Sequence, residues 1–301
     1  MKKPNFFIIG APKCGTTSLA SWLSEHPNIY ISPIKEPMFF CPENDPHRAR
    51  SNMSDYEYLF RHAGEQHIAV GEASTFYLLS QTAVTNIENT YSKARYIIML
   101  RNPINMAYSW HEQNVSMGSE HVTDFESAWR LSPERRCGRK TAFWIPYPQK
   151  LDYMKMCSLG AHLERFFKII PRDRALVLIL DDIKQDARRE YFKVLKFLGV
   201  PDDERKIFPV KNPAKQARSR GIRDFLQFVI FEYRTLRRLL KIPAYKTTGV
   251  LKFVAKNNTY SRPRPPMSKK LRQELGEFFT DDIKKLEKLL SRDFSHWLRQ
   301  E

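Results

Sequence analysis

The chain has 301 residues, of which 42% are hydrophobic and 13% aromatic, so it can bury a sizeable core. This composition excludes the low-hydrophobicity class of disordered chains. The 50 Lys and Arg residues exceed the 33 Asp and Glu residues, and the formal net charge is +17. From residue 211 onward, 22 basic and 9 acidic residues carry a net +13 of this surplus. The charge favours an anionic partner, such as a nucleotide or an acidic polymer, although a basic surface also serves solubility.

The cysteines and the N-terminal segment indicate a reduced, cytoplasmic protein. The four cysteines, at positions 14, 41, 137 and 157, form no CxxC pair and have no metal-ligand spacing. We therefore expect free thiols and no metal site. No apolar run is long enough to span a membrane, and the apolar run at 5–9 is too short for a signal peptide. We expect a soluble protein that has neither a membrane nor a nucleic acid as its partner.

Short apolar runs alternate with helical patterns in chain order. Strands are expected at 6–9, 29–31, 68–70, 96–100 and 176–180, and helices at 16–25, 103–117, 149–169, 186–198, 222–240 and 268–290. A proline-rich, basic stretch at 259–266 is expected to form an extended loop. Buried strands separated by helices predict an α/β fold whose parallel sheet is covered on both faces. We expect a single domain over 1–301 with a basic helical portion from about residue 200.

The segment GAPKCGTTS at 10–18 joins the first expected strand to the first expected helix. Unpaired N–H groups and the dipole at a helix start attract anions, and Lys13 adds a positive charge. The spacing of Gly10 and Gly15 matches the triphosphate-binding pattern GxxxxGK[ST], but Thr16 stands where that pattern has its lysine. The segment therefore predicts a phosphate-binding loop for a ligand other than a nucleoside triphosphate. The simpler alternative is an ordinary turn before a capped helix.

The segment PKCGTTSL at 12–19 resembles the 5′-phosphosulfate-binding loop of sulfotransferases, which use 3′-phosphoadenosine 5′-phosphosulfate (PAPS). That family holds the 3′-phosphate with an Arg and a Ser separated by seven residues, and Arg101 and Ser109 have this separation after the strand at 96–100. The resemblance implies a P-loop-like three-layer fold, PAPS as co-substrate, adenosine 3′,5′-bisphosphate (PAP) as product, and no required metal. It assigns nucleotide binding to Lys13, Cys14, Gly15, Thr16, Thr17, Ser18, Arg101 and Ser109.

The general base differs between two classes of this family. The cytosolic small-molecule class has a histidine soon after a middle strand, whereas the heparan sulfate class has a glutamate in a Glu-x-x-Phe-Phe segment. The segment EPMFF at 36–40 matches the second class, and GEASTFY at 71–77 contains no histidine. The resemblance therefore makes Glu36 the general base and Lys13 the residue that neutralises the leaving phosphate. The simpler alternative for Glu36 is a surface ion pair with Lys35.

Two departures from the family pattern leave roles open. The carbohydrate class has a lysine where Ala73 stands, and Glu72 and Ser74 are candidates to replace its contact. The vertebrate carbohydrate enzymes also place a Lys-Gly-Arg loop over the nucleotide late in the chain. That triplet is absent here, and RSR at 218–220 or KNN at 256–258 are the candidates to serve instead.

The predicted function is sulfuryl transfer from PAPS to a hydroxyl or amine of a carbohydrate or small-molecule acceptor. Glu72 and His111 are further candidates for the base role. A P-loop nucleotide kinase is one alternative function, because Asp181 and Asp182 after an expected strand imitate a magnesium-holding strand end. A non-catalytic binder of an anionic polymer is the other, suggested by the +17 charge. The oligomeric state is not predicted.

Overall fold

The computed structural model describes residues 2–41, 52–141, 148–211 and 266–299, together with 215–217, 259–261 and the single residues 219, 221 and 229. The chain divides into two compact units, Met1–Arg101 with Leu159–Asn212 and Asn102–Ser158 with Pro213–Glu301. The single domain expected over 1–301 stays a prediction. No helix in the described part is long and apolar enough to cross a membrane. The cytoplasmic location also stays a prediction.

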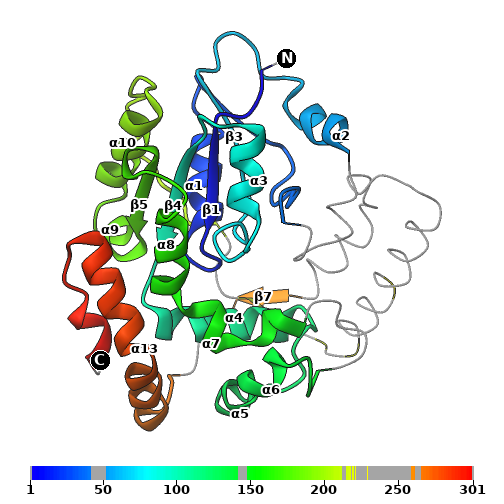
Figure 1. Ribbon diagram of the computed structural model, residues 1–301, viewed down its shortest axis with the longest axis vertical. Helices are drawn as coiled ribbons and strands as arrows, with labels where there is room; N and C mark the ends of the chain where they lie inside the picture. Colours follow the sequence, from blue (N-terminus) through cyan, green and yellow to red (C-terminus); the bar gives the residue numbers. More distant parts are fainter. Residues whose placement is uncertain are drawn as a thin grey trace. The chain divides into compact units, whose positions relative to one another are not determined.

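The first unit contains a five-stranded parallel sheet (Figure 1). Its strands, in sheet order, are β2 (Ile29–Ile31), β3 (Ala69–Ala73), β1 (Phe6–Gly10), β4 (Arg95–Leu100) and β5 (Ala175–Ile179). Every neighbouring pair runs parallel. The central strand β1 is buried along its whole length because its sequence, FFIIG, has no polar side chain to solvate. The five expected strands and the parallel sheet are confirmed, with small shifts at the strand ends.

Helices lie on both faces of this sheet. They are α1 (Thr16–Leu23), α3 (Ala83–Thr90), α8 (Leu159–Phe167), α9 (Leu180–Gln185) and α10 (Ala187–Leu198), with the short α2 (Met53–Glu57) and the 3-10 turns η1 (Tyr58–Phe60) and η3 (Arg172–Arg174). Figure 1 shows α3 and α8 in front of the sheet and α1 behind it. The connections β1–α1–β2 and β3–α3–β4 cross the sheet in opposite directions. Because connections between parallel strands are almost always right-handed, two that run in opposite directions place their helices on opposite faces. The three-layer α/β fold is confirmed, and its strand order reverses around β1, where ligands of such sheets bind.

The second unit is mainly helical in its described part. It contains α4 (Pro103–Ser116), α5 (Phe125–Arg130), α6 (Ser132–Arg136), α7 (Tyr153–Cys157), α13 (Lys269–Leu290), the 3-10 turns η2 (Pro148–Leu151) and η4 (Ser295–Leu298), and the antiparallel pair β6 (Lys215–Ala217) and β7 (Thr259–Ser261). Helix α13 buries an apolar stripe, as its pattern predicts. The Trp129 ring on α5 lies 5.6 Å from the Phe279 ring of this stripe. Packing of this stripe holds α13 in the unit.

Two expected elements differ from the structure. The single helix expected over 149–169 is wrong, because the chain there forms η2, α7 and α8. Asp152 begins α7 by accepting the Lys155 N–H at 3.1 Å, and Ser158 ends it with a non-helical ψ of 71°. The loop expected at 259–266 contains β7, a strand too short to have a periodic signal. The helix expected over 222–240 lies outside the described residues apart from residue 229.

A buried ion pair links the loop after α4 to helix α6 in the second unit. Arg135 and Glu120 each have side chains that are 2% exposed, and their Nη1 and Oε2 atoms lie 2.6 Å apart. The Tyr153 hydroxyl donates to the same Glu120 oxygen at 2.9 Å. Because a buried charge without its partner is strongly unfavourable, removing one member should cost far more than removing both.

Arg135→Met is expected to lower the free energy of unfolding by about 3–5 kcal/mol, because it leaves the Glu120 carboxylate buried without a cation. The double variant Arg135→Met with Glu120→Leu should recover a large part of that loss. Urea unfolding followed by circular dichroism measures both. A single variant as stable as the unsubstituted protein would contradict the structural weight given to this pair.

Candidate active site

The loop between β1 and α1 has a backbone shaped for close approach of a ligand. Gly15 precedes α1 with a left-handed φ of 90°, and a Cβ atom there would lie 3.0 Å from the Leu180 Cδ1 and 3.2 Å from the Met99 Cε. Only glycine meets both conditions without strain. The first turn of α1 contains no acidic residue. This geometry is compatible with an anion at the start of the helix, and the phosphate-binding role of the loop stays a prediction.

The side chains of this loop differ in what they can offer a ligand. Cys14 is completely buried, and its Sγ contacts the Pro12 carbonyl at 3.4 Å. Burial raises the pKa of Cys14 to about 12, so its side chain stays a neutral thiol. Only the main chain of Cys14 is left to serve a ligand. Thr16 and Ser18 are 3% and 7% exposed, and both place hydroxyls in the first turn of α1.

An irregular segment at 201–211 is a part of this region that sequence reasoning missed. It contains no helix, although a basic helical portion was expected from about residue 200. The Trp22 Nε1 of α1 donates to the Pro209 carbonyl at 3.0 Å, and the Phe208 ring lies 5.1 Å from the Trp22 ring. The segment ends with the Lys211 N–H donating to the Ser18 Oγ at 3.0 Å. Because this oxygen accepts, the Ser18 hydroxyl can direct its own hydrogen to an anion.

Arg101 lies directly after the carboxyl end of β4 and contacts the loop. Its Nη1 donates to the Lys13 carbonyl at 3.0 Å. On the same side, the Ala11 N–H donates to the Met99 carbonyl of β4 at 2.7 Å. The structure therefore brings the predicted 3′-phosphate arginine to the predicted 5′-phosphosulfate loop. Ser109 is 1% exposed on α4 in the second unit, and its pairing with Arg101 stays a prediction.

Glu36 lies at the carboxyl end of β3. Its N–H donates to the Ala73 carbonyl at 2.9 Å. Its Oε1 accepts hydrogen bonds from the Thr75 hydroxyl at 3.2 Å and from the Lys35 Nζ at 3.1 Å, and its side chain is 26% exposed. The ion pair proposed as the simpler alternative is therefore present, and the same carboxylate also lies at the edge of the sheet where the base is expected.

Thr75 connects Glu36 to the phosphate loop, a contact that no motif in the sequence predicts. A Cβ atom on Gly10, whose φ is 157°, would lie 3.1 Å from the Thr75 carbonyl and 2.7 Å from the Leu78 Cβ. The segment after β3 is thus packed against the last residue of β1. One residue, Thr75, contacts both Gly10 through its main chain and Glu36 through its side chain. The loop and the candidate base therefore share one edge of the sheet.

Glu72 and Ser74 do not take the place of the lysine that the carbohydrate class has at position 73. Both are 0% exposed. The Glu72 carboxylate accepts hydrogen bonds from the hydroxyls of Ser74 and Tyr77, each at 2.7 Å, and of Tyr56 at 3.3 Å. Burial raises the pKa of Glu72 to about 7, although these three donors lower it. Neither residue reaches solvent, so neither can contact a sulfate or act on an acceptor directly.

His111, the second candidate base, has the surroundings of a structural histidine. It is 2% exposed, and its Nε2 lies 2.8 Å from the Val122 carbonyl. Burial lowers its pKa, because a charged imidazolium would be poorly solvated there. The ring contacts those of Phe125 and Tyr153. These contacts explain its presence on α4 without a catalytic role.

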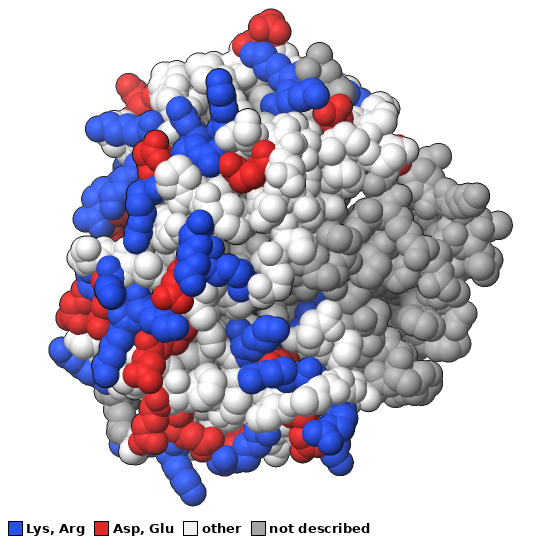
Figure 2. All heavy atoms as spheres, in the orientation of Figure 1, with Lys and Arg blue, Asp and Glu red and all other residues white. Residues whose placement is uncertain are grey.

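The surface charges and acidic clusters bear on the alternative functions. Figure 2 shows Lys and Arg side chains interspersed with Asp and Glu on one face of the molecule, as is typical of a solvated surface. Asp181 and Asp182 lie in the first turn of α9, directly after β5, as the kinase alternative requires. The described residues include no group of three or more His, Cys, Asp or Glu placed to hold a metal ion.

The two segments expected to cover the nucleotide, 218–220 or 256–258, lie outside the described residues except for residue 219.

Comparison with known proteins identifies the family. The family model described as a sulfotransferase domain matches residues 3–215. The chain belongs to the sulfotransferase family. This confirms the resemblance drawn from the loop at 12–19, and the match includes Glu36, Arg101 and Ser109.

Similar proteins support this family. Human carbohydrate sulfotransferase 15 is 26% identical over 268 residues, covering 71% of this chain and 47% of that protein. Human bifunctional heparan sulfate N-deacetylase/N-sulfotransferase 3 is 25% identical over 319 residues, covering 99% of this chain and 31% of that protein. The chain thus spans less than half the length of these two curated relatives. The crystal structure of a sulfotransferase from Alicyclobacillus acidocaldarius has a TM-score of 0.72 and 26% identity, covering 99% of this chain and 100% of that one.

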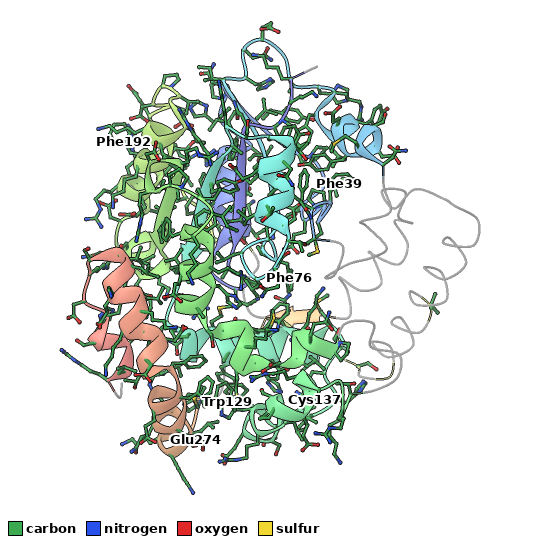
Figure 3. All side chains as sticks on the ribbon, in the orientation of Figure 1. Phe39, Phe76, Trp129, Cys137, Phe192 and Glu274 are labelled. Atoms are coloured by element: carbon green, nitrogen blue, oxygen red, sulfur yellow. The ribbon has the colours of Figure 1, made fainter. Side chains whose placement is uncertain are left out.

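The sulfotransferase loop makes a testable prediction about thiol reactivity. Cys14, Cys41 and Cys157 are buried, whereas Cys137, labelled in Figure 3, is exposed. Ellman's reagent at about pH 8 should therefore modify one thiol rapidly, since a thiol with the raised pKa of Cys14 forms almost no thiolate there. Cys137→Ser should remove the rapid reaction. Rapid labelling of Cys14 in that variant would show that the loop does not enclose it.

Proposed function

We propose that this sulfotransferase moves a sulfuryl group from PAPS to a hydroxyl or amine of a carbohydrate or small-molecule acceptor. One observation carries the proposal: the phosphate loop, Arg101 and Glu36 meet at the carboxyl edge of three adjacent strands. The names of the similar proteins, a carbohydrate sulfotransferase and a heparan sulfate N-sulfotransferase, support a carbohydrate acceptor among these classes. The kinase alternative is weakened by Thr16, which stands where a triphosphate loop has lysine.

The described residues fit a nucleotide with two separate anionic groups. The start of α1 supplies oriented N–H groups and hydroxyls, and the left-handed Gly15 lets the main chain come close to a ligand. Arg101, one strand away, supplies a planar cation suited to a phosphate. In this proposal the loop binds the 5′-phosphosulfate and Arg101 the 3′-phosphate. The residues that hold the nucleotide are Lys13, Cys14 through its main chain, Gly15, Thr16, Thr17, Ser18, Arg101 and Ser109.

The proposed chemistry divides between Glu36 and Lys13. PAPS supplies an activated sulfuryl group for in-line displacement. Glu36 takes the proton from the attacking hydroxyl or amine, and the contacts from Thr75 and Lys35 to its Oε1 hold the carboxylate in one orientation. Lys13 stabilises the negative charge that develops on the leaving phosphate. No step of this proposal needs a metal ion from the protein.

Arg101→Ala is expected to weaken PAP binding about tenfold or more, because it removes a charge-assisted contact to a phosphate. Isothermal titration calorimetry with PAP measures this loss. Arg95→Ala is the matched control, since Arg95 lies at the opposite end of β4 and donates instead to the Phe197 carbonyl at 2.7 Å. The control should bind PAP like the unsubstituted protein.

The same titrations decide between the candidate functions. PAP binding without comparable binding of magnesium-ATP is the expected result. Preference for magnesium-ATP would overturn the sulfotransferase mechanism and favour the kinase, and binding of neither would favour the anionic-polymer binder. Unchanged PAP affinity in the Arg101→Ala variant would remove Arg101 from the 3′-phosphate site.

Glu36→Gln is expected to keep PAP affinity within about twofold while lowering transfer at least about a hundredfold, because it removes the base but no nucleotide contact. The assay follows labelled sulfate from PAPS onto N-deacetylated heparan backbone and onto the same polymer fully N-acetylated. Transfer to the first alone identifies an amine acceptor, and transfer to both identifies a hydroxyl. Lys13→Ala should abolish transfer to either.

Glu57→Gln is the matched control for the base. Glu57 lies in α2, its Oε1 is 3.1 Å from the Lys3 Nζ, and its side chain is 21% exposed, much like the Glu36–Lys35 pair. The control variant should retain normal transfer. Full activity of the Glu36→Gln variant would pass the base role to another residue.

A further inference from the structure

The segment that carries Glu36 has an unusual backbone. Glu36 and Met38 have left-handed φ values of 57° and 53°, a conformation that residues with a Cβ atom rarely adopt. Two such residues within three positions need contacts that impose the conformation. Strained backbone of this kind concentrates at functional sites and persists only where the surroundings determine it.

Three main-chain N–H groups anchor this segment to the region of β3. The Glu36 N–H donates to the Ala73 carbonyl. The Met38 N–H donates to the Ser74 Oγ at 3.0 Å, and the Phe40 N–H donates to the Tyr77 hydroxyl at 3.4 Å. Two of the three anchors are therefore side-chain hydroxyls, which can rotate and need something else to orient them.

Glu72 orients both of those hydroxyls. Ser74 donates its only hydroxyl hydrogen to the Glu72 Oε2, and Tyr77 donates its own to the Oε1, each at 2.7 Å. Once that hydrogen is committed, each hydroxyl oxygen can only accept, which is what the N–H groups of Met38 and Phe40 require. An ionised carboxylate has no hydrogen to donate, so it imposes this direction on both hydroxyls at once.

Stability alone does not account for a carboxylate at this position. Glu72 is fully buried within a strand whose other residues are apolar or glycine, and a packed apolar side chain would avoid the cost of desolvating it. We propose that Glu72 is a positioning residue, which fixes Ser74 and Tyr77 as acceptors and thereby holds the 36–40 segment so that Glu36 faces the reacting group. This inference rests on the proposed base role of Glu36.

Tyr77→Phe and Tyr56→Phe form a matched pair that tests the proposal. Each removes one hydroxyl that donates to the Glu72 Oε1 and keeps the buried ring, but only the Tyr77 hydroxyl accepts the Phe40 N–H. Tyr77→Phe should raise the hydrogen-exchange rates of the amides of Glu36 and residues 38–41 and lower kcat, each about tenfold, with the KM for PAPS unchanged. Tyr56→Phe should change neither by more than about twofold.

Glu72→Gln should produce the same split between kcat and KM, and a larger rise in exchange at 36–41, because the amide can donate to the hydroxyls and release both anchors. All measurements belong at about pH 8, which lies above the raised pKa of Glu72, about 7, so that the carboxyl is mostly ionised. Equal effects of the two tyrosine variants, or normal exchange in Tyr77→Phe, would overturn the proposal. If Glu72→Gln fails to fold, the tyrosine pair decides alone.

The exchange measurement also separates this inference from the proposed function. It uses the protein without PAPS or acceptor, so it reports the 36–40 segment whatever reaction the chain performs. A fully active Glu36→Gln variant would reject the base role of Glu36, and with it the positioning role of Glu72. Loss of transfer in Glu36→Gln combined with unchanged exchange in Tyr77→Phe would reject Glu72 while the base role stands.

Discussion

The close approach of the chain at Gly10 is the constraint on which the site depends. Because no Cβ atom is present there, the segment after β3 packs directly on the end of β1, and Thr75 reaches Glu36 from that position. On the other side of β1, the Ala11 N–H binds the carbonyl of Met99 in β4. The start of the phosphate loop is thereby tied to both neighbouring strands, which places the candidate base and the candidate nucleotide site at one edge.

The positive charge of the loop is arranged differently from that of a triphosphate site. The lysine lies at the left-handed position 13, ahead of the helix, and the Lys13 carbonyl accepts a hydrogen bond from Arg101. The Arg101 guanidinium therefore supports the backbone of the loop, and its positive charge lies at the carboxyl end of β4. Cys14 fills the space beneath the loop as a neutral thiol. In the proposed function, the main chain of the loop binds the anion, and no lysine extends along a polyphosphate.

The sequence predicted those parts of the molecule that depend on local pattern. Continuous apolar runs such as FFII predicted the buried strands, and the glycine spacing predicted the phosphate loop. Contacts between distant segments had no such signal: the Lys211 N–H reaches Ser18 through its main chain, which any residue could supply. The role of Thr75 depends on packing against Gly10. The interruption of the helix at Ser158 depends on a single backbone angle. Periodicity does not encode any of these.

The absence of the family's lysine at position 73 is consistent with how this edge is built. Ala73 still serves the site through its carbonyl, which accepts the Glu36 N–H, and this contact does not depend on its side chain. Lys35, which is partly exposed, forms an ion pair with Glu36 at 3.1 Å. A partly exposed ion pair adds at most about 1 kcal/mol to the stability of the fold. The main effect of this pair is therefore to orient the Glu36 carboxylate. The backbone of this segment is held separately, because the Ser74 and Tyr77 hydroxyls donate to Glu72 and accept the N–H groups of Met38 and Phe40. The side chain of Glu36 and the backbone that carries it therefore depend on different residues.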